Sequence, residues 1–158
     1  MAKVIALCGK ICSGKTHHAK ELCRRLPAVS LSCDELTLEL FDGSLGEKHD
    51  AMAARIQALM LRKAVEIVRA GANVVLDSGF WKRTDREEAV CFFREAGVEL
   101  EWHYLDVDDE TWKRNIAARN EAVLRGDERS YFVDEGLLQK CLSLFEAPSR
   151  DENFSTYP

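Results

Sequence analysis

An eight-residue segment near the N-terminus constrains the fold of this chain more than any other feature. It reads Gly9-Lys10-Ile11-Cys12-Ser13-Gly14-Lys15-Thr16 and fits the pattern G-x-x-x-x-G-K-[ST] without a mismatch. An apolar run over 3–8 precedes it, and a helical stretch over 14–26 follows it. Glycines let the backbone curl so that successive N–H groups point inward, and a helix adds its positive N-terminal end. The segment therefore predicts a strand, a phosphate-binding loop and a helix, in that order.

The same pattern predicts the chemistry of this loop. All eight residues from Gly9 to Thr16 form the predicted nucleotide-binding segment. Lys15 is expected to reach the β- and γ-phosphates, and Thr16 to place its hydroxyl on Mg²⁺. The alternative is a chance match in a glycine-containing turn, but chance requires neither the apolar run before the loop nor the helix after it.

The rest of the chain alternates between strand-like and helix-like segments. Strands are expected over 3–8, 28–32, 73–77 and 98–105, and helices over 14–26, 33–41, 47–70, 85–96, 109–125 and 135–145. Capping boxes, in which a side chain caps the helix start, are predicted at Ser32–Glu35 and Thr84–Glu87. This order predicts one α/β domain over 1–158, a parallel sheet with helices on both faces. The tail over 153–158 is either a fifth edge strand or a frayed end.

Composition narrows the classes of protein. The chain has 158 residues, 46% of them hydrophobic and 31% charged, with a net charge of −5. Such a chain buries a core and is not disordered. An apolar stretch of about 18 residues and a secretion signal are both missing from the sequence, which predicts a cytoplasmic protein without a membrane span. The acidic balance gives no general attraction for nucleic acid.

Cysteine usage agrees with a cytoplasmic protein. The six cysteines are Cys8, Cys12, Cys23, Cys33, Cys91 and Cys141. Cys8, Cys33 and Cys91 lie in apolar or strand-like runs, and reduced, mostly buried thiols are expected. The alternative is a zinc site, which requires paired cysteine or histidine ligands at tight spacing.

Two acids are expected at strand ends. Asp34 follows the second strand, and Asp77 ends the third. Ligands of open α/β sheets bind beyond the carboxyl ends of the strands. Phosphoryl transfer uses one acid to organise Mg²⁺ and another to accept the proton of an attacking hydroxyl. For Asp34 the alternative role is stabilisation of a helix N-terminus. For Asp77, burying a carboxylate at a strand end costs free energy, which favours a functional role for this residue.

Two groups of basic residues are further candidates. Arg114 and Arg119 are five residues apart, so on one helix they diverge by about 140°. Either they reach a phosphate site from a lid, or they belong to a solvated helix. Arg83 and Arg86 follow the segment 77–81, whose aromatic residues either line an acceptor pocket or pack the loop down.

These motifs together resemble a known family. The matching pieces are ALCGKICSGKT (6–16), LSCDEL (31–36), VVLDSGF (74–80) with Arg83 and Arg86, and the pair Arg114 and Arg119. They resemble the small P-loop kinases, AAA-type ATP-binding proteins that include zeta toxins, the kinase domain of polynucleotide kinase and chloramphenicol phosphotransferase. The resemblance implies a P-loop three-layer fold with strand order 2-3-1-4-5.

The resemblance also implies an activity. It implies ATP with Mg²⁺, Asp34 as the general base, and Arg114 and Arg119 as lid arginines. With Lys15, these form the expected catalytic set; Thr16 and Asp77 form the expected metal site. The residues expected near the acceptor are Asp34, Asp77, Ser78, Arg83 and Arg86. The expected reaction moves the γ-phosphate of ATP to a hydroxyl of a small molecule or a nucleic-acid end. The alternative is a nucleotide-binding ATPase or switch module without an acceptor.

Overall fold

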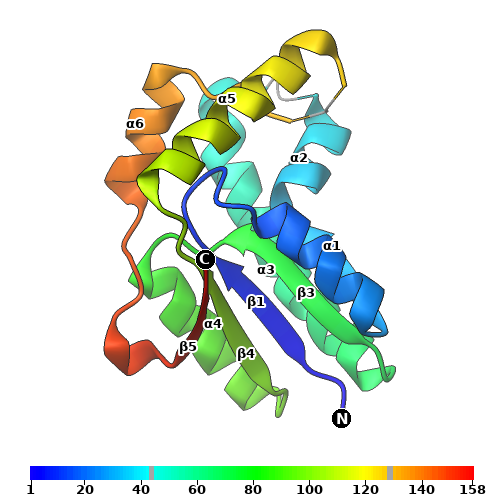
Figure 1. Cartoon of the computed structure of the whole chain (residues 1–158). Coiled ribbons are helices and arrows are strands. Elements are labelled where there is room, and N and C mark those ends of the chain that lie inside the picture. The colour runs from blue at the N-terminus through cyan, green and yellow to red at the C-terminus, as the bar shows by residue number, and fades with distance from the viewer. Residues whose placement is uncertain (43–44, 128–129) are drawn as a thin grey trace.

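The computed structural model describes residues 1–42, 45–127 and 130–158. Its centre is one parallel sheet of five strands in the order β2-β3-β1-β4-β5. Figure 1 shows β3, β1, β4 and β5 of this sheet. The strands are β1 (Val4–Cys8), β2 (Ala28–Ser32), β3 (Asn73–Gly79), β4 (Leu100–Leu105) and β5 (Phe154–Tyr157). This confirms the expected order 2-3-1-4-5. It also decides the tail over 153–158, in which Phe154–Tyr157 form the fifth, edge strand rather than a frayed end.

In the part of the chain that the structure describes, six α-helices connect or follow these strands. They are α1 (Lys15–Arg25), α2 (Cys33–Phe41), α3 (His49–Arg69), α4 (Arg83–Glu95), α5 (Asp109–Arg125) and α6 (Glu135–Leu144). Two short 3₁₀ turns, η1 (Gly46–Lys48) and η2 (Arg150–Glu152), precede α3 and β5. Most of these bounds lie within two residues of those predicted from the sequence.

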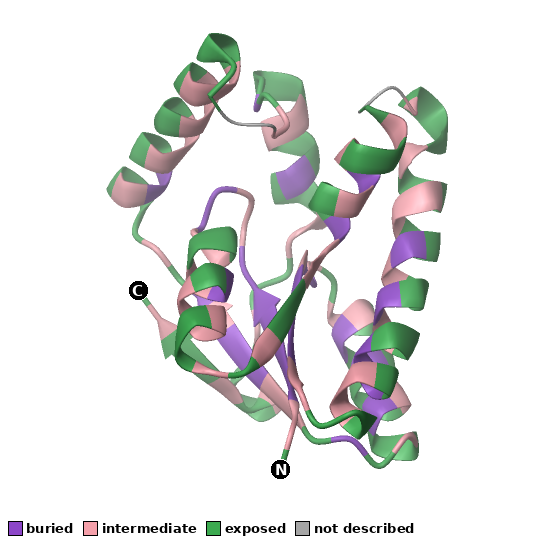
Figure 2. Ribbon diagram, turned by 90° about the vertical axis from the view of Figure 1, so that its right-hand side faces the viewer, coloured by how far each residue is buried: buried purple, intermediate pink, exposed green. Residues whose placement is uncertain are grey.

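Alternating side chains of the central strands build the core on both faces of the sheet. Ile5 and Leu7 point to the face covered by α1, where they pack with Ala19. Val4, Ala6 and Cys8 belong to the larger cluster on the opposite face, which α3 and α4 cover. Figure 2 shows that burial is concentrated in the central strands and on the sheet-facing sides of the helices. The three-layer prediction is therefore confirmed.

Several local predictions need correction. The capping box at Thr84–Glu87 is wrong, because α4 begins at Arg83 with Lys82 at its N-cap and no side-chain cap. The Ser32 cap is confirmed, since its hydroxyl accepts from the Glu35 amide at 3.2 Å. Cys91 is exposed on α4 rather than buried.

Strand register brings the predicted acids to one edge of the sheet. Asp77 lies opposite Leu7 of β1 on one side and opposite Ser32 of β2 on the other. The phosphate loop leaves the end of β1, and α2 begins directly after Ser32. Helices α5 and α6 lie above this edge in Figure 1. The fold thus gathers the loop, Asp34 and Asp77 at one place. Within the described ranges, no helix is long and apolar enough to cross a bilayer.

Candidate functional site

A large cavity opens at the carboxyl edge of the sheet. Its volume is about 1250 Å³, and its walls come from the phosphate loop, β3, α2, α3, α5 and α6. Of the predicted site residues, the following line it: Ile11, Cys12, Ser13, Gly14, Lys15, Thr16, Asp34, Asp77, Ser78 and Arg119. One concave site of this size with convergent polar groups is the expected form of a small-molecule site.

The phosphate loop has the backbone that its sequence predicts. Gly14 has φ +92°, in the left-handed region that favours glycine, directly before α1. A Cβ at Gly9 would lie 2.5 Å from the Ser13 Oγ and 3.0 Å from the Leu105 carbonyl oxygen. Glycine is therefore required at position 9 because neighbouring atoms lie too close for a Cβ, and at position 14 because of the left-handed backbone conformation.

The Lys15 ammonium lies over this loop. Its Nζ donates to the Gly9 carbonyl at 2.9 Å and to the Lys10 carbonyl at 2.6 Å. Burial lowers the pKa of Lys15, while the charges of Asp77 and Asp34 oppose that shift. An ammonium held on two carbonyls at the end of a strand is placed to meet an anion bound in the loop.

Thr16 and Asp77 form a pair of oxygen donors. The Thr16 hydroxyl donates to Oδ2 of Asp77 at 2.7 Å, and Asp77 is 7% exposed. A hydroxyl and a carboxylate are the hard ligands that Mg²⁺ takes together with phosphate oxygens. The side chains present here therefore fit the predicted metal site. The alternative zinc site has no such support: the six cysteines form no disulfide, and the described residues contain no cluster of three or more His, Cys, Asp or Glu side chains that could hold a metal ion.

Asp34 sits in the first turn of α2 and faces the cavity. The residue is exposed to solvent, yet desolvation by the surrounding protein raises the pKa of Asp34 above its usual range. The positive charges of Lys15 and Arg119 oppose this shift, whereas Asp77 adds to it. A carboxylate with a raised pKa close to a phosphate-binding lysine is suited to accept a proton near neutral pH.

The two candidate lid arginines do not share one role. Arg119 lines the cavity, and its charge acts on both Asp34 and Lys15. Arg114 is exposed on α5, where its guanidinium donates to the Thr111 hydroxyl at 3.2 Å. The structure thus brings Arg119 to the site and leaves Arg114 outside it.

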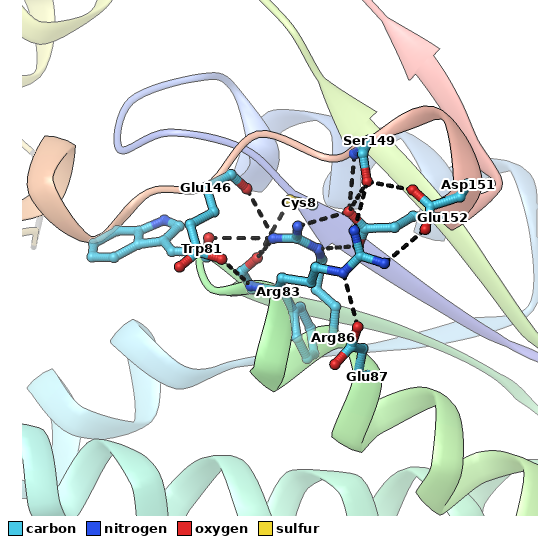
Figure 3. Close-up of polar contacts among 10 residues, drawn as sticks. Cys8, Trp81, Arg83, Arg86, Glu87, Glu146, Ser149, Asp151 and Glu152 are labelled. Atoms are coloured by element: carbon cyan, nitrogen blue, oxygen red, sulfur yellow. Dashed lines mark hydrogen bonds and ion pairs between the residues drawn. The ribbon is translucent and has the colours of Figure 1, made fainter.

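Arg83 and Arg86 have carboxylate partners in the protein (Figure 3), and these partners are not among the described residues that line the cavity. Arg86 is 2% exposed and makes two hydrogen bonds to Glu152, at 2.6 and 2.9 Å. Arg83 pairs with Glu87 at 2.8 Å and with Asp151 at 2.7 Å. The pairs with Glu152 and Asp151 hold α4 against the chain before β5. Neither arginine is among the described residues that line the cavity, so their contact with the acceptor stays a prediction that the structure does not support.

Lys10 occupies a variable position of the loop motif, and its side chain also contacts other residues of the protein. Its ammonium lies 4.2 Å from the centre of the Trp112 ring and 3.8 Å from an oxygen of Asp109. A cation over an indole face is stabilised by the ring quadrupole. The Lys10 side chain thus connects the phosphate loop to the first turns of α5.

The cavity also contains three polar residues that sequence reasoning did not find, namely His49, Gln57 and Tyr131. Ser78 donates to Oε1 of Gln57 at 2.7 Å, and Nε2 of His49 lies 3.2 Å from the Tyr131 hydroxyl. All four residues line the cavity. Gln57 and His49 come from α3, and Tyr131 comes from the segment before α6. Gln57 is 21 positions from Ser78 in the chain, and His49 is 82 positions from Tyr131. No short motif could connect them, although polar side chains interrupting the apolar stripe of α3 were a weak signal.

Comparison with known proteins decides the family. A model of an AAA domain, AAA_33, matches residues 4–148. The chain belongs to this family. No curated protein matches this AAA domain.

Several solved structures, a gluconokinase among them, share its fold. A gluconokinase from Sinorhizobium meliloti 1021 is 18% identical, with a TM-score of 0.69 over 98% of this chain and 81% of the other. Kti12 from Chaetomium thermophilum, in complex with ADP-AlF3, is 17% identical, with a TM-score of 0.65 over 98% and 88%. A chain of the Pnkp1/Rnl/Hen1 RNA repair complex is 18% identical, with a TM-score of 0.68 over 90% of this chain.

This AAA domain spans 43% of that last chain and 38% of a chain in a second Pnkp1/Rnl/Hen1 structure. Identities near 20% establish the fold alone. The expected P-loop kinase-like architecture is thereby confirmed, and the AAA domain match implies that the chain binds a nucleotide.

Proposed function

We propose that this AAA domain transfers the γ-phosphate of ATP to a hydroxyl group of a small molecule or of a nucleic-acid end. The observation that carries the proposal is the place of Asp34, which shares one cavity with Lys15 and Thr16 of the phosphate loop. Hydrolysis or switching needs no carboxylate on the acceptor side of that cavity, whereas transfer to an alcohol does.

The phosphate side of the reaction uses the loop. Backbone amides and Lys15 bind the β- and γ-phosphates, and Thr16 and Asp77 would hold Mg²⁺. When bound, Mg²⁺ neutralises charge on the phosphates. Arg119 adds a second cation, which stabilises charge on the oxygens of the group in transfer. The gluconokinase that shares this fold supports a kinase activity for the chain.

The acceptor side uses Asp34. The acceptor hydroxyl gives its proton to the Asp34 carboxylate as its oxygen forms a bond to the γ-phosphorus. The bond between that phosphorus and the β–γ bridging oxygen breaks, and ADP leaves with the electron pair. The raised pKa of Asp34 strengthens it as a base compared with an ordinary aspartate.

Polar groups beyond Asp34 are available to position the acceptor. The Ser78–Gln57 and His49–Tyr131 pairs lie on the cavity wall and offer both donors and acceptors. A cavity of about 1250 Å³ exceeds the roughly 300–1,000 Å³ typical of a single-ligand site, which supports a two-substrate reaction.

The test measures ADP release from Mg·ATP with separate pools of sugars, nucleosides, amino alcohols and oligonucleotides with 5′-hydroxyl ends. One pool is expected to stimulate release, and Lys15→Ala is expected to abolish that stimulation. Asp34→Asn is expected to reduce acceptor-dependent release by about 10²- to 10⁴-fold, the usual contribution of a general base. Its affinity for ADP should stay within about threefold of the wild type, because Asp34 does not belong to the loop.

Glu35→Gln is the matched control. Glu35 is the next acid of α2, is exposed and is not among the described residues that line the cavity. This variant removes the same charge from the same helix turn and should keep full activity. Undiminished transfer by Asp34→Asn would show that Asp34 only stabilises the N-terminus of α2. Slow, acceptor-independent release from every pool would favour an ATPase or switch.

A further inference from the structure

The carbonyl oxygens of the phosphate loop are held by side chains that lie outside the loop motif. Nε1 of Trp81 donates to the Gly9 carbonyl at 3.1 Å, and Nε1 of Trp112 donates to the Ile11 carbonyl at 2.6 Å. Nδ2 of Asn115 donates to the Cys12 carbonyl at 3.0 Å. Three donors from two distant parts of the chain therefore fix three of the first four peptide carbonyls of the loop.

Fixing a carbonyl also fixes an amide. The C=O and the N–H of a planar trans peptide point in opposite directions. The bond from Trp81 thus orients the amide of Lys10, and the bond from Trp112 orients the amide of Cys12. Phosphate affinity depends on amides that already point at the ligand, because a loop that must reorganise loses binding free energy.

Two of the donors belong to α5. Trp112 and Asn115 are three residues apart, so they share one face of this helix. Trp112 is 8% exposed and packs against Cys12 and Val133, with the Lys10 ammonium over its ring. The indole is therefore held firmly, and its N–H has a fixed direction.

The third donor, Trp81, is fastened by the chain around it. Its carbonyl accepts from the Glu146 amide at 2.8 Å and from Arg86 at 3.2 Å (Figure 3). Its indole lies over Gly79, where a Cβ would come within 2.8 Å of Nε1. The buried Arg86–Glu152 pair therefore secures the residue that secures the start of the phosphate loop.

We propose that Trp81, Trp112 and Asn115 are positioning residues that preorganise the phosphate loop for a nucleotide. The proposal rests on nucleotide binding, the first step of the proposed function, and does not depend on phosphate transfer. It predicts that removing one N–H donor weakens nucleotide binding even where the protein remains folded.

The experiment uses the three tryptophans of the chain. Trp81→Phe and Trp112→Phe keep an aromatic ring but lose the donor. Trp102→Phe is the matched control, because Trp102 is a 5% exposed core residue whose ring packs on Phe80 and Phe154. Affinity for ADP with Mg²⁺ is measured by titration calorimetry, and thermal midpoints are measured in parallel.

Each loop-facing variant should bind ADP about 2- to 12-fold more weakly, the range that the net contribution of one hydrogen bond gives. Trp102→Phe should lower the thermal midpoint and leave ADP affinity within about twofold. If Trp112→Phe fails to fold, Asn115→Ala, at a half-buried site, should show the same loss of affinity. Wild-type affinity in the folded loop-facing variants would overturn the proposal, whatever their thermal midpoints.

The experiment also separates this proposal from the proposed function. A wild-type protein that binds no ADP would overturn both. Normal binding by the wild type with unchanged binding in the variants would overturn the positioning role alone. Weakened binding in the variants would support the role even if no acceptor pool stimulated ADP release.

Discussion

The buried pair of Arg86 and Glu152 provides a sharp test of how this fold is held together. The Arg86 side chain is 2% exposed and that of Glu152 10% exposed, and two hydrogen bonds of 2.6 and 2.9 Å join them. Arg86 also donates to the carbonyls of Phe80, Trp81 and Glu146. Glu152→Gln would leave the guanidinium buried without a counter-charge.

The expected cost follows from that geometry. Removing one partner of a buried ion pair costs about 3–5 kcal/mol. Glutamine keeps one acceptor oxygen, so the lower end, about 3 kcal/mol, applies. At roughly 2–4 °C per kcal/mol for a domain of this size, the thermal midpoint should fall by about 6–12 °C. Urea unfolding followed by circular dichroism would measure the free energy of unfolding directly.

Asp151→Asn is the matched control. Asp151 directly precedes Glu152 in the chain and pairs with Arg83 of α4, but this ion pair lies on the exposed surface. An exposed pair contributes little, so this variant should unfold near the wild-type midpoint. Equal losses in the two variants, or a negligible loss in Glu152→Gln, would refute the reasoning that burial decides the cost.

The same pair predicts a dependence on pH. The hydrogen bonds from Arg86 hold the pKa of Glu152 below its usual range. The pair's contribution is therefore fully present above the unfolded-state pKa of about 4.3 and is lost as pH falls through the lower folded-state pKa. The stability difference between the wild type and Glu152→Gln should shrink across that acidic window. A difference that stays constant there would contradict the linkage.

Two further outcomes follow from the titration of single groups. Because enclosure raises the pKa of Asp34, the acid limb of kcat/KM against pH should lie above the ordinary aspartate range; a limb at the ordinary value would contradict its role as base. The exposed Cys91 should react with a thiol reagent well before Cys8, because burial raises the pKa of Cys8 to about 11. Mass spectrometry of partly labelled protein would measure the order of reaction, and labelling of Cys8 first would contradict this prediction.

The sequence was sufficient for the architecture because local signals agreed with one another. The loop motif demanded a strand before it and a helix after it, and the apolar run ending at Asp77 supplied a second buried strand. Parallel strands place their carboxyl ends at one edge, which is why Asp34 and Asp77 meet Lys15 there. The resemblance to small P-loop kinases added the strand order, which periodicity alone does not give.

The partners of charged residues were beyond reach of the sequence. Arg86 was assigned to the acceptor because it follows Asp77 in the chain, but its carboxylate partner is 66 positions away in the turn before β5. Nothing in the local pattern distinguishes an arginine that binds a ligand from one that fastens the C-terminal segment. The same holds for Arg83, whose partner Asp151 is 68 positions away.

The choice between Arg114 and Arg119, however, could have been made from helical geometry. Relative to Trp112 on α5, Arg119 is seven residues on and about 20° away around the helix axis, whereas Arg114 is about 160° away. Trp112 is the large apolar residue of α5 that helix amphipathicity predicts to be buried, so the helix face that carries it packs against the rest of the protein. That face carries Asn115 onto the phosphate loop and Arg119 into the cavity. Because one helix face does both, a shift of α5 that disturbs the loop must also move the arginine.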